Sequence, residues 1–149
     1  MASGYSNHDM EYLRVTDART ISSSSFNRSG LTINRLTDPL PGHGLSGDHA
    51  LENATLLSVQ LRDFNGKLWK NGRPVPTGTF GAGEFTVYDF RDTWRADLVS
   101  EFDCLNIHLP FESFHALSPH MSGSFDGIRV GAGLSVADGP ITSIANVLA

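Results

Sequence analysis

Hydrophobic and polar residues alternate most regularly over residues 55–62 of the chain. Val59 and Leu61 fall on one side of an extended backbone, and Gln60 and Arg62 fall on the other. Successive side chains of a β-strand point to opposite faces of the sheet, so this period of two predicts a half-buried strand.

Three later segments also have the composition or the period of a strand. Residues 84–90 are rich in β-branched and aromatic side chains, and residues 102–109 alternate again with a period of two. Residues 96–99 are predicted as a short strand between them, after a polar link at residues 92–95. Pro110 is expected to end the last strand.

The strongest turn signal is the dipeptide Asn71-Gly72, which stands between residues 67–70 and residues 73–75. This dipeptide favours positive φ at both central positions of a type I′ turn, so it predicts a β-hairpin. Pro74 cannot donate a ladder hydrogen bond, which places the second strand of the hairpin at a sheet edge or in a turn.

The N-terminal third of the chain is less regular. Residues 1–20 are a polar lead, and residues 21–26 and 31–36 are predicted as a hairpin around a turn that contains Gly. A loose tail is the competing interpretation of the serine run in this region. Residues 37–53 contain too many Gly and Pro residues for regular structure and are predicted as a surface loop.

Many short strands separated by Gly and Pro, with helical patterns only late in the chain, predict a mainly β fold closed into a barrel or sandwich. A chain of 149 residues is long enough for one domain. We assign the barrel to residues 21–117, with a short helix at residues 111–117. A linker and a C-terminal helix account for residues 118–149.

The last residues have the period of an amphipathic helix. Ile141, Ile144 and Leu148 recur on one face, after an Asp and a Pro that suit the start of a helix. A helix of about nine residues has little stability in water unless it packs against something. Either the barrel or a second subunit is therefore expected to cover this apolar face.

Charge and composition argue against several classes of function. The formal net charge is −5, and acidic residues are interleaved with the basic ones, so no direct contact of this chain with nucleic acid is expected. No apolar run reaches the roughly 20 residues of a membrane-spanning helix, and the start has no secretion signal, so we expect no membrane contact and a cytoplasmic location. Cys104 is the only cysteine, and its apolar surroundings in the sequence indicate a small buried side chain.

The residues that enzymes use form no recognisable motif in this sequence. The six histidines include no His-x-His pair, so neither a metal site nor another cofactor is predicted. There is no Gly-x-Ser-x-Gly motif, and the Gly-rich residues 78–83 lack the Lys-Ser/Thr ending of a phosphate-binding loop. These observations predict a protein that is not an enzyme.

The order and spacing of several segments resemble the N-terminal domain of a subgroup of AraC-family transcription regulators. The resemblance covers about residues 56–117 of the chain. Its segments are LSVQLRD at 57–63, LWKNGRPV at 68–75, AG at 82–83 through YDFR at 88–91, SEFD at 100–103, and the closing LP at 109–110.

The resemblance implies a cupin-like barrel, a double-stranded β-helix, that binds a small-molecule effector. It also implies a homodimer formed through helices that follow the barrel, with Ile141, Ile144 and Leu148 at the seam. DNA binding then belongs to a further domain with helix-turn-helix motifs, which is absent from this chain. Two alternatives remain open, namely a small metal-dependent cupin enzyme and a stand-alone carbohydrate-binding module.

The expected barrel interior defines a candidate ligand site. Ligand pockets are mostly apolar and contain a few polar groups that orient the ligand. The polar or aromatic side chains that we expect to bind the effector are Gln60, Arg62, Trp69, Tyr88, Asn106 and His108. For each of them, a solvent-facing or purely structural role is the alternative interpretation.

Overall fold

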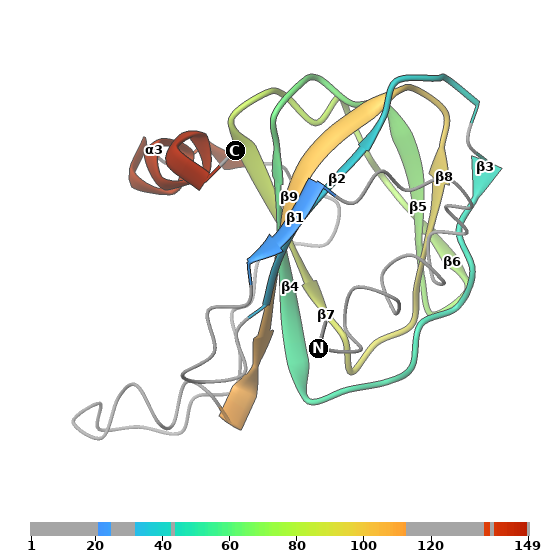
Figure 1. Ribbon diagram of the computed structural model, residues 1–149. Coiled ribbons are helices and arrows are strands. Elements are labelled where there is room, and N and C mark those ends of the chain that lie inside the picture. Colours follow the sequence, from blue (N-terminus) through green and yellow to red (C-terminus); the bar gives the residue numbers. More distant parts are fainter. Residues whose placement is uncertain (1–20, 25–31, 43, 113–135, 138, 149) are drawn as a thin grey trace.

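The computed structural model describes residues 21–24, 32–42, 44–112, 136–137 and 139–148. Within these residues the chain folds into two β-sheets that face each other, with one helix outside them (Figure 1). Every pair of neighbouring strands in both sheets is antiparallel.

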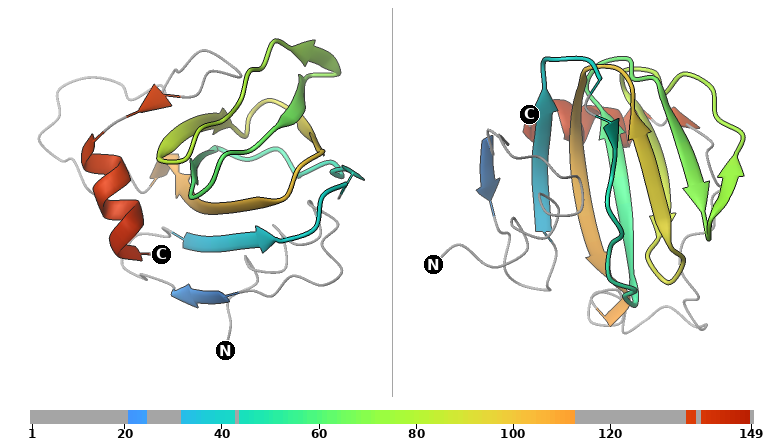
Figure 2. Two further views of the ribbon diagram at one scale, coloured as in Figure 1. Left: turned by 90° about the horizontal axis from the view of Figure 1, so that it is seen from above. Right: turned by 90° about the vertical axis from the view of Figure 1, so that its right-hand side faces the viewer.

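The two sheets differ in size. The larger sheet consists of β1 (Ile21–Ser24), β2 (Thr32–Asp38), β4 (Ala54–Gln60), β7 (Glu84–Asp89), β9 (Phe102–Pro110) and β10 (Val136–Ala137). The smaller sheet consists of β3 (Gly44–Leu45), β5 (Gly66–Lys70), β6 (Arg73–Val75) and β8 (Trp94–Leu98). The helix α3 (Gly139–Leu148) lies on the side of the larger sheet that faces away from the smaller sheet (Figures 1 and 2).

The strand order identifies the fold. The larger sheet runs β1-β2-β9-β4-β7-β10 and the smaller sheet runs β3-β8-β5-β6, so the chain crosses repeatedly between the sheets. Strands β2 to β9 thereby form two interleaved Greek keys, which is the double-stranded β-helix of cupin barrels. The predicted fold class is confirmed.

Several predicted strands are present with closely similar bounds. β1 pairs with β2, which confirms the strand pairing of the predicted N-terminal hairpin, while its predicted turn lies outside the described residues. β4, β7 and β9 occupy the segments where alternation and β-branched residues predicted strands. The predicted helix at residues 111–117 and the polar lead at residues 1–20 lie largely or wholly outside the described residues.

Two segments that were predicted to be irregular contribute strands to the smaller sheet. Residues 37–53 contain β3, and the predicted polar link at residues 92–95 contains the start of β8. Bonds between distant residues hold these strands, since the Ser46 N–H donates to the Ala96 carbonyl at 2.7 Å and the Ala96 N–H donates to the Ser46 hydroxyl at 2.9 Å. Local sequence could not reveal such bonds.

The hairpin of β5 and β6 turns at Asn71 and Gly72, as predicted. Their φ angles are 50° and 75°, the positive values that a type I′ turn requires. The Asn71 side chain accepts a hydrogen bond from the Thr93 N–H at 2.9 Å, which joins the turn to the residue before β8. Pro74 lies on β6, the edge strand of the smaller sheet.

The strand β4 is buried on both faces and not on one, which corrects the prediction of a half-buried strand. Val59 has an exposed fraction of 0%, and its side chain packs with Leu105 in a cluster on the outer face of the larger sheet. Ser58 and Gln60 face the barrel interior and are also buried. The polar side of this strand therefore points inward.

We predict that Gly72→Val destabilises the fold. Added atoms at Gly72 meet open space, so the expected loss of about 1–3 kcal/mol in the free energy of unfolding comes from backbone strain alone. Gly78→Val is the matched control, because Gly78 also faces open space and its φ is not positive. Thermal unfolding of both variants measures the difference, and an equal effect at the two positions would contradict the turn assignment.

Candidate functional site

A cavity of about 80 Å³ lies between the two sheets. Its lining comes from both sheets and is mainly apolar and aromatic. The lining residues are Leu56, Ser58, Gln60, Phe64, Leu68, Tyr88, Phe90, Trp94, Ala96, Leu98, Phe102, Cys104 and Asn106. None of them carries a charged side chain, so the polar character of the cavity comes from amide and hydroxyl groups.

Four polar side chains form one row, called the polar row below, across the inner face of the larger sheet. Asn34 lies opposite Asn106 on the neighbouring strand, Asn106 lies opposite Ser58, and Ser58 lies opposite Thr86. Residues that are directly opposite in an antiparallel ladder point to the same face. Since Ser58 and Asn106 line the cavity, this polar row crosses the barrel interior.

The polar row is buried and incompletely hydrogen-bonded. The exposed fractions of its members lie between 1% and 7%. Within the described part of the chain, the Asn106 Oδ1 and Thr86 Oγ1 atoms have no hydrogen-bond partner. A buried acceptor left without a partner costs about 1–3 kcal/mol. A molecule that donated hydrogen bonds to this row would remove part of that cost.

Gln60 adds a second unpartnered oxygen to the same cavity. Gln60 is 6% exposed, and its Oε1 atom has no hydrogen-bond partner among the described residues. The Nε2 group donates to the Ser58 hydroxyl at 3.4 Å, which is a long hydrogen bond. Gln60 lies opposite Cys104 across the β4–β9 ladder, one level beyond the polar row.

An aromatic pair forms a rigid part of the cavity wall. The rings of Tyr88 and Trp94 meet edge to face, with centroids 5.1 Å apart and an interplanar angle of 85°. The Trp94 indole N–H donates to the Asp89 carbonyl at 2.9 Å, and the residue is 3% exposed. Trp94 was not among the predicted site residues, because residues 92–95 were predicted to form a polar link outside the strands.

The two histidines among the described residues have structural partners. His49 accepts the Trp94 backbone N–H on Nε2 at 3.1 Å, and its Nδ1 lies 2.8 Å from the Ala50 carbonyl. Because Nε2 accepts a hydrogen bond, Nδ1 is the ring nitrogen that can donate to the Ala50 carbonyl. The Nε2 of His108 lies 3.0 Å from the Glu52 carboxylate. His108 is buried but does not line the cavity.

The structure brings three of the six predicted ligand-binding residues together. Gln60, Tyr88 and Asn106 line the cavity, whereas Arg62, Trp69 and His108 do not. Arg62 follows the end of β4, is exposed, and pairs with Glu101 at 2.8 Å. Trp69 lines a cleft on the outer face of the smaller sheet.

Ser58 and Thr86 belong to the polar row but were not among the predicted residues. Ser58 stands on the polar side of the 55–62 pattern, beside Gln60, and this position was the available signal. The hydroxyl of Thr86 gave no signal, because β-branched residues are common throughout strands.

The helix α3 occupies the segment predicted for the C-terminal amphipathic helix. The side chains of Ile141, Ile144 and Leu148, predicted at a dimer seam, lie outside the described part of the structure. Val147, which stands on another side of the helix, is 86% exposed. The homodimer stays a prediction.

The described residues contain no group of three His, Cys, Asp or Glu side chains placed to hold a metal ion. No helix among them is long and apolar enough to cross a membrane. Because part of the chain is not described, the predicted absence of metals and cofactors stays a prediction.

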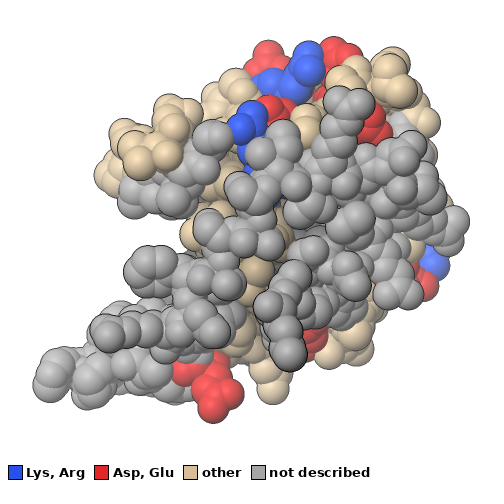
Figure 3. Space-filling model, in the orientation of Figure 1, with Lys and Arg blue, Asp and Glu red and all other residues tan. Residues whose placement is uncertain are grey.

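Several basic side chains pair with carboxylates. Arg35 donates two hydrogen bonds to Asp103, at 2.9 and 2.8 Å, and Lys70 lies 2.8 Å from Asp92. On the face shown in Figure 3, the described Lys and Arg side chains stand beside Asp and Glu.

The ion pair of Lys70 and Asp92 makes a pH-dependent contribution to stability. The hydrogen bond from Lys70 lowers the pKa of the Asp92 carboxyl, against partial burial, which raises it. The stabilisation is therefore present above the pKa of this carboxyl in the unfolded chain and is lost as the pH falls through its folded-state pKa.

Comparison with known proteins gives matches of fold only. No protein-family model matches the sequence, and no curated protein matches it. The cupin domain of Schizosaccharomyces pombe Cnp3 matches with a TM-score of 0.49 and 7% identity, over 77% of this chain and 82% of that chain.

Two further matches come from different classes of protein. A predicted oxalate decarboxylase from Thermotoga maritima matches with a TM-score of 0.42 and 20% identity, over 54% of this chain and 66% of that chain. An HTH_3 family transcriptional regulator from Vibrio cholerae matches with a TM-score of 0.42 and 19% identity, over 62% of this chain and 49% of that chain. This chain thus spans just under two thirds of the first and about half of the second.

The prediction that this protein is not an enzyme is corrected by these matches. The matched structures include the predicted oxalate decarboxylase and also KdgF from Halomonas sp.. The missing motifs could not exclude catalysis, because such motifs identify only some mechanisms.

We predict opposite effects for two matched threonine substitutions. Thr55 and Thr86 are each 1% exposed, but among the described residues only the Thr55 hydroxyl has a partner, the Tyr88 carbonyl at 3.0 Å. Thr55→Val should lower the free energy of unfolding by about 1 kcal/mol, whereas Thr86→Val should leave it unchanged or raise it. Denaturant unfolding compares the two, and equal losses would mean that the Thr86 hydroxyl is hydrogen-bonded.

Proposed function

We propose that this chain is a binding barrel for a small uncharged molecule, and that it serves as the effector-sensing domain of a transcription regulator. One observation carries the binding function. Two buried amide oxygens, Gln60 Oε1 and Asn106 Oδ1, have no partner within the described residues and belong to side chains that line the same cavity. Unsatisfied buried acceptors in a mainly apolar pocket are groups that a ligand can satisfy.

The lining indicates the charge of the ligand. Burying an ion without a partner of opposite charge costs far more than burying a neutral polar group. Among the described residues that line the cavity, none is an Asp, Glu, Lys, Arg or His that could pair with an ion. We therefore infer an uncharged ligand that donates through N–H or O–H groups on one edge.

The cavity also limits the size of the ligand. Since one water molecule needs roughly 10–15 Å³, a cavity of about 80 Å³ holds on the order of six non-hydrogen atoms. The polar edge of such a molecule would meet Gln60 and Asn106 on the larger sheet. Its apolar edge would meet Leu68 and Ala96, which line the cavity from the smaller sheet.

The regulatory part of the proposal rests on the resemblance of residues 56–117 to the AraC-type sensing domain. In that family the barrel senses the effector, and a separate domain binds DNA. An in-frame helix-turn-helix segment after Ala149 in the source gene is the expected finding. A stop codon at that point would remove the support for a regulator while leaving the binding function in place.

We predict that uncharged probes enter the cavity and perturb Trp94. The ¹⁵N-labelled chain is titrated with propionamide, propane-1,2-diol and phenol, and with propionate and propylammonium as charged counterparts. At least one uncharged probe should shift the indole N–H resonance of Trp94, because its ring lines the cavity, and the charged counterparts should not. Gln60→Leu and Asn106→Leu should each weaken that binding roughly tenfold, the effect of one or two lost hydrogen bonds.

Arg62→Leu is the control for these variants, because Arg62 is exposed and does not line the cavity. Its binding should match that of the unmodified chain. Equal shifts from charged and uncharged probes, or unchanged binding in both cavity variants, would refute the proposed site.

A further inference from the structure

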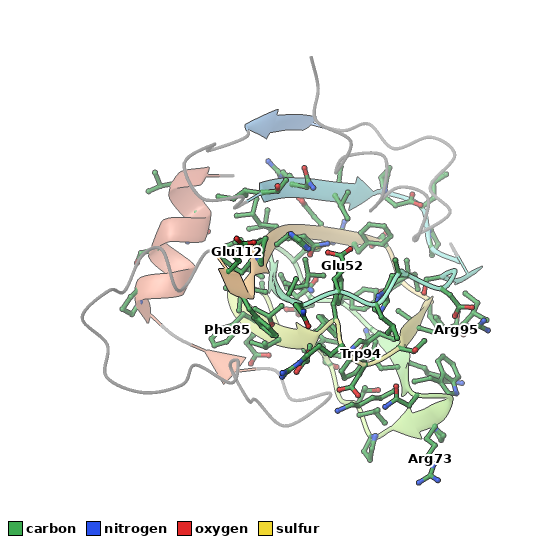
Figure 4. All side chains as sticks on the ribbon, turned by 90° about the horizontal axis from the view of Figure 1, so that it is seen from below. Glu52, Arg73, Phe85, Trp94, Arg95 and Glu112 are labelled. Carbon is green, nitrogen blue, oxygen red and sulfur yellow. The ribbon has the colours of Figure 1, made fainter. Side chains whose placement is uncertain are left out.

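A second hollow lies on the outer face of the smaller sheet. Its volume is about 730 Å³, which falls within the roughly 300–1,000 Å³ typical of small-molecule sites. Trp69, Arg95, Asp97 and Asp48 line it together with residues of the hairpin turn. Figure 4 shows Arg95 pointing away from the barrel.

The alternation of β5 and β8 separates this cleft from the interior cavity. Trp69 lies opposite Arg95 in the β5–β8 ladder, so both side chains share the outer face. The preceding residue Leu68 lies opposite Ala96, and these two side chains line the interior cavity. The cleft and the cavity therefore stand on opposite faces of one sheet.

The cleft contains groups that are available to a ligand. The Trp69 ring is half-buried, and its indole N–H makes no hydrogen bond within the described part of the chain. The Asp97 carboxylate likewise has no hydrogen bond or ion pair with a described residue. The cleft thus offers a hydrogen-bond donor, the indole N–H, and an acceptor, the Asp97 carboxylate, beside the Trp69 ring.

An ion pair holds a third polar group in place beside them. The Arg95 guanidinium donates from Nε and from a terminal nitrogen to the two oxygens of Asp48, at 2.6 and 2.7 Å. Such a bidentate pair keeps the guanidinium in a defined plane. This pair uses only two of the guanidinium N–H groups, and the Arg95 side chain is 47% exposed.

We propose that this cleft binds an uncharged sugar ring. The apolar C–H face of a sugar ring packs against a tryptophan ring, while its hydroxyls both donate and accept hydrogen bonds. Asp97 accepts from one hydroxyl, and Arg95 and the Trp69 indole N–H donate to others. An anionic ligand would meet Asp48 and Asp97, and a cationic ligand would meet Arg95, so the mixed charges favour a neutral ligand rich in hydroxyls.

The two tryptophans of the chain provide separate reporters for the two sites. Trp69 lines the outer cleft and Trp94 lines the interior cavity. The ¹⁵N-labelled full chain is titrated with methyl glucoside, methyl galactoside and N-acetylglucosamine, and separately with choline and glucose 6-phosphate. At least one uncharged sugar should shift the Trp69 indole resonance with saturation, without shifting that of Trp94.

Variants of the charged residues make the test specific. Arg95→Leu and Asp97→Asn should each weaken sugar binding roughly tenfold, as expected for the loss of a hydrogen bond to a charged group. Arg62→Leu removes an exposed arginine that also pairs with a carboxylate but lies outside the cleft, so it should bind as the unmodified chain does.

Three results would overturn the proposal. The first is that no sugar shifts Trp69, and the second is that choline or glucose 6-phosphate shifts it more than the sugars do. The third is a sugar-induced shift of Trp94 alone, which would assign binding to the interior cavity and leave the function proposed for that cavity standing.

Discussion

The register between β4 and β9 is the constraint on which both the core and the cavity depend. The ladder runs from Ala54 opposite Pro110 to Gln60 opposite Cys104. Side chains alternate between the two faces, so a slip of one residue would turn Gln60 outward and bring Val59 into the barrel. The single register that buries Val59 against Leu105 is also the one that points the amides inward.

The unpartnered polar groups of the barrel are best understood as a balance between stability and binding. The Asn106 Oδ1 and Thr86 Oγ1 atoms have no partner among the described residues, so an apolar side chain at either position would cost less free energy than the polar one does. The fold tolerates them because apolar burial surrounds them on both faces of the larger sheet. Without a ligand, a protein with such a site is less stable than it would be with apolar residues at these positions. This loss of stability is common where function requires a group that the fold does not require.

Local signals revealed the parts of the structure that depend on neighbouring residues. Asn71 and Gly72 predicted their own turn, because the positive φ values are a property of these two residues. β3 was not predicted, because its pairing with β8 depends on residues about fifty positions away. For the cavity, alternation placed Gln60 on a polar face but could not show that this face points inward. Asn106 lies opposite Ser58 because of the register between β4 and β9. The sequence of one segment alone does not reveal this register.

A single layer of backbone separates the interior cavity from the outer cleft. Leu68 and Trp69 are consecutive on β5 and face opposite ways, and so do Arg95 and Ala96 on β8. A ligand that leaves β5 and β8 in place is therefore detected only on its own side of this layer. A ligand that displaced the strands would move the groups on both sides, and the resulting coupling free energy would be equal in both directions.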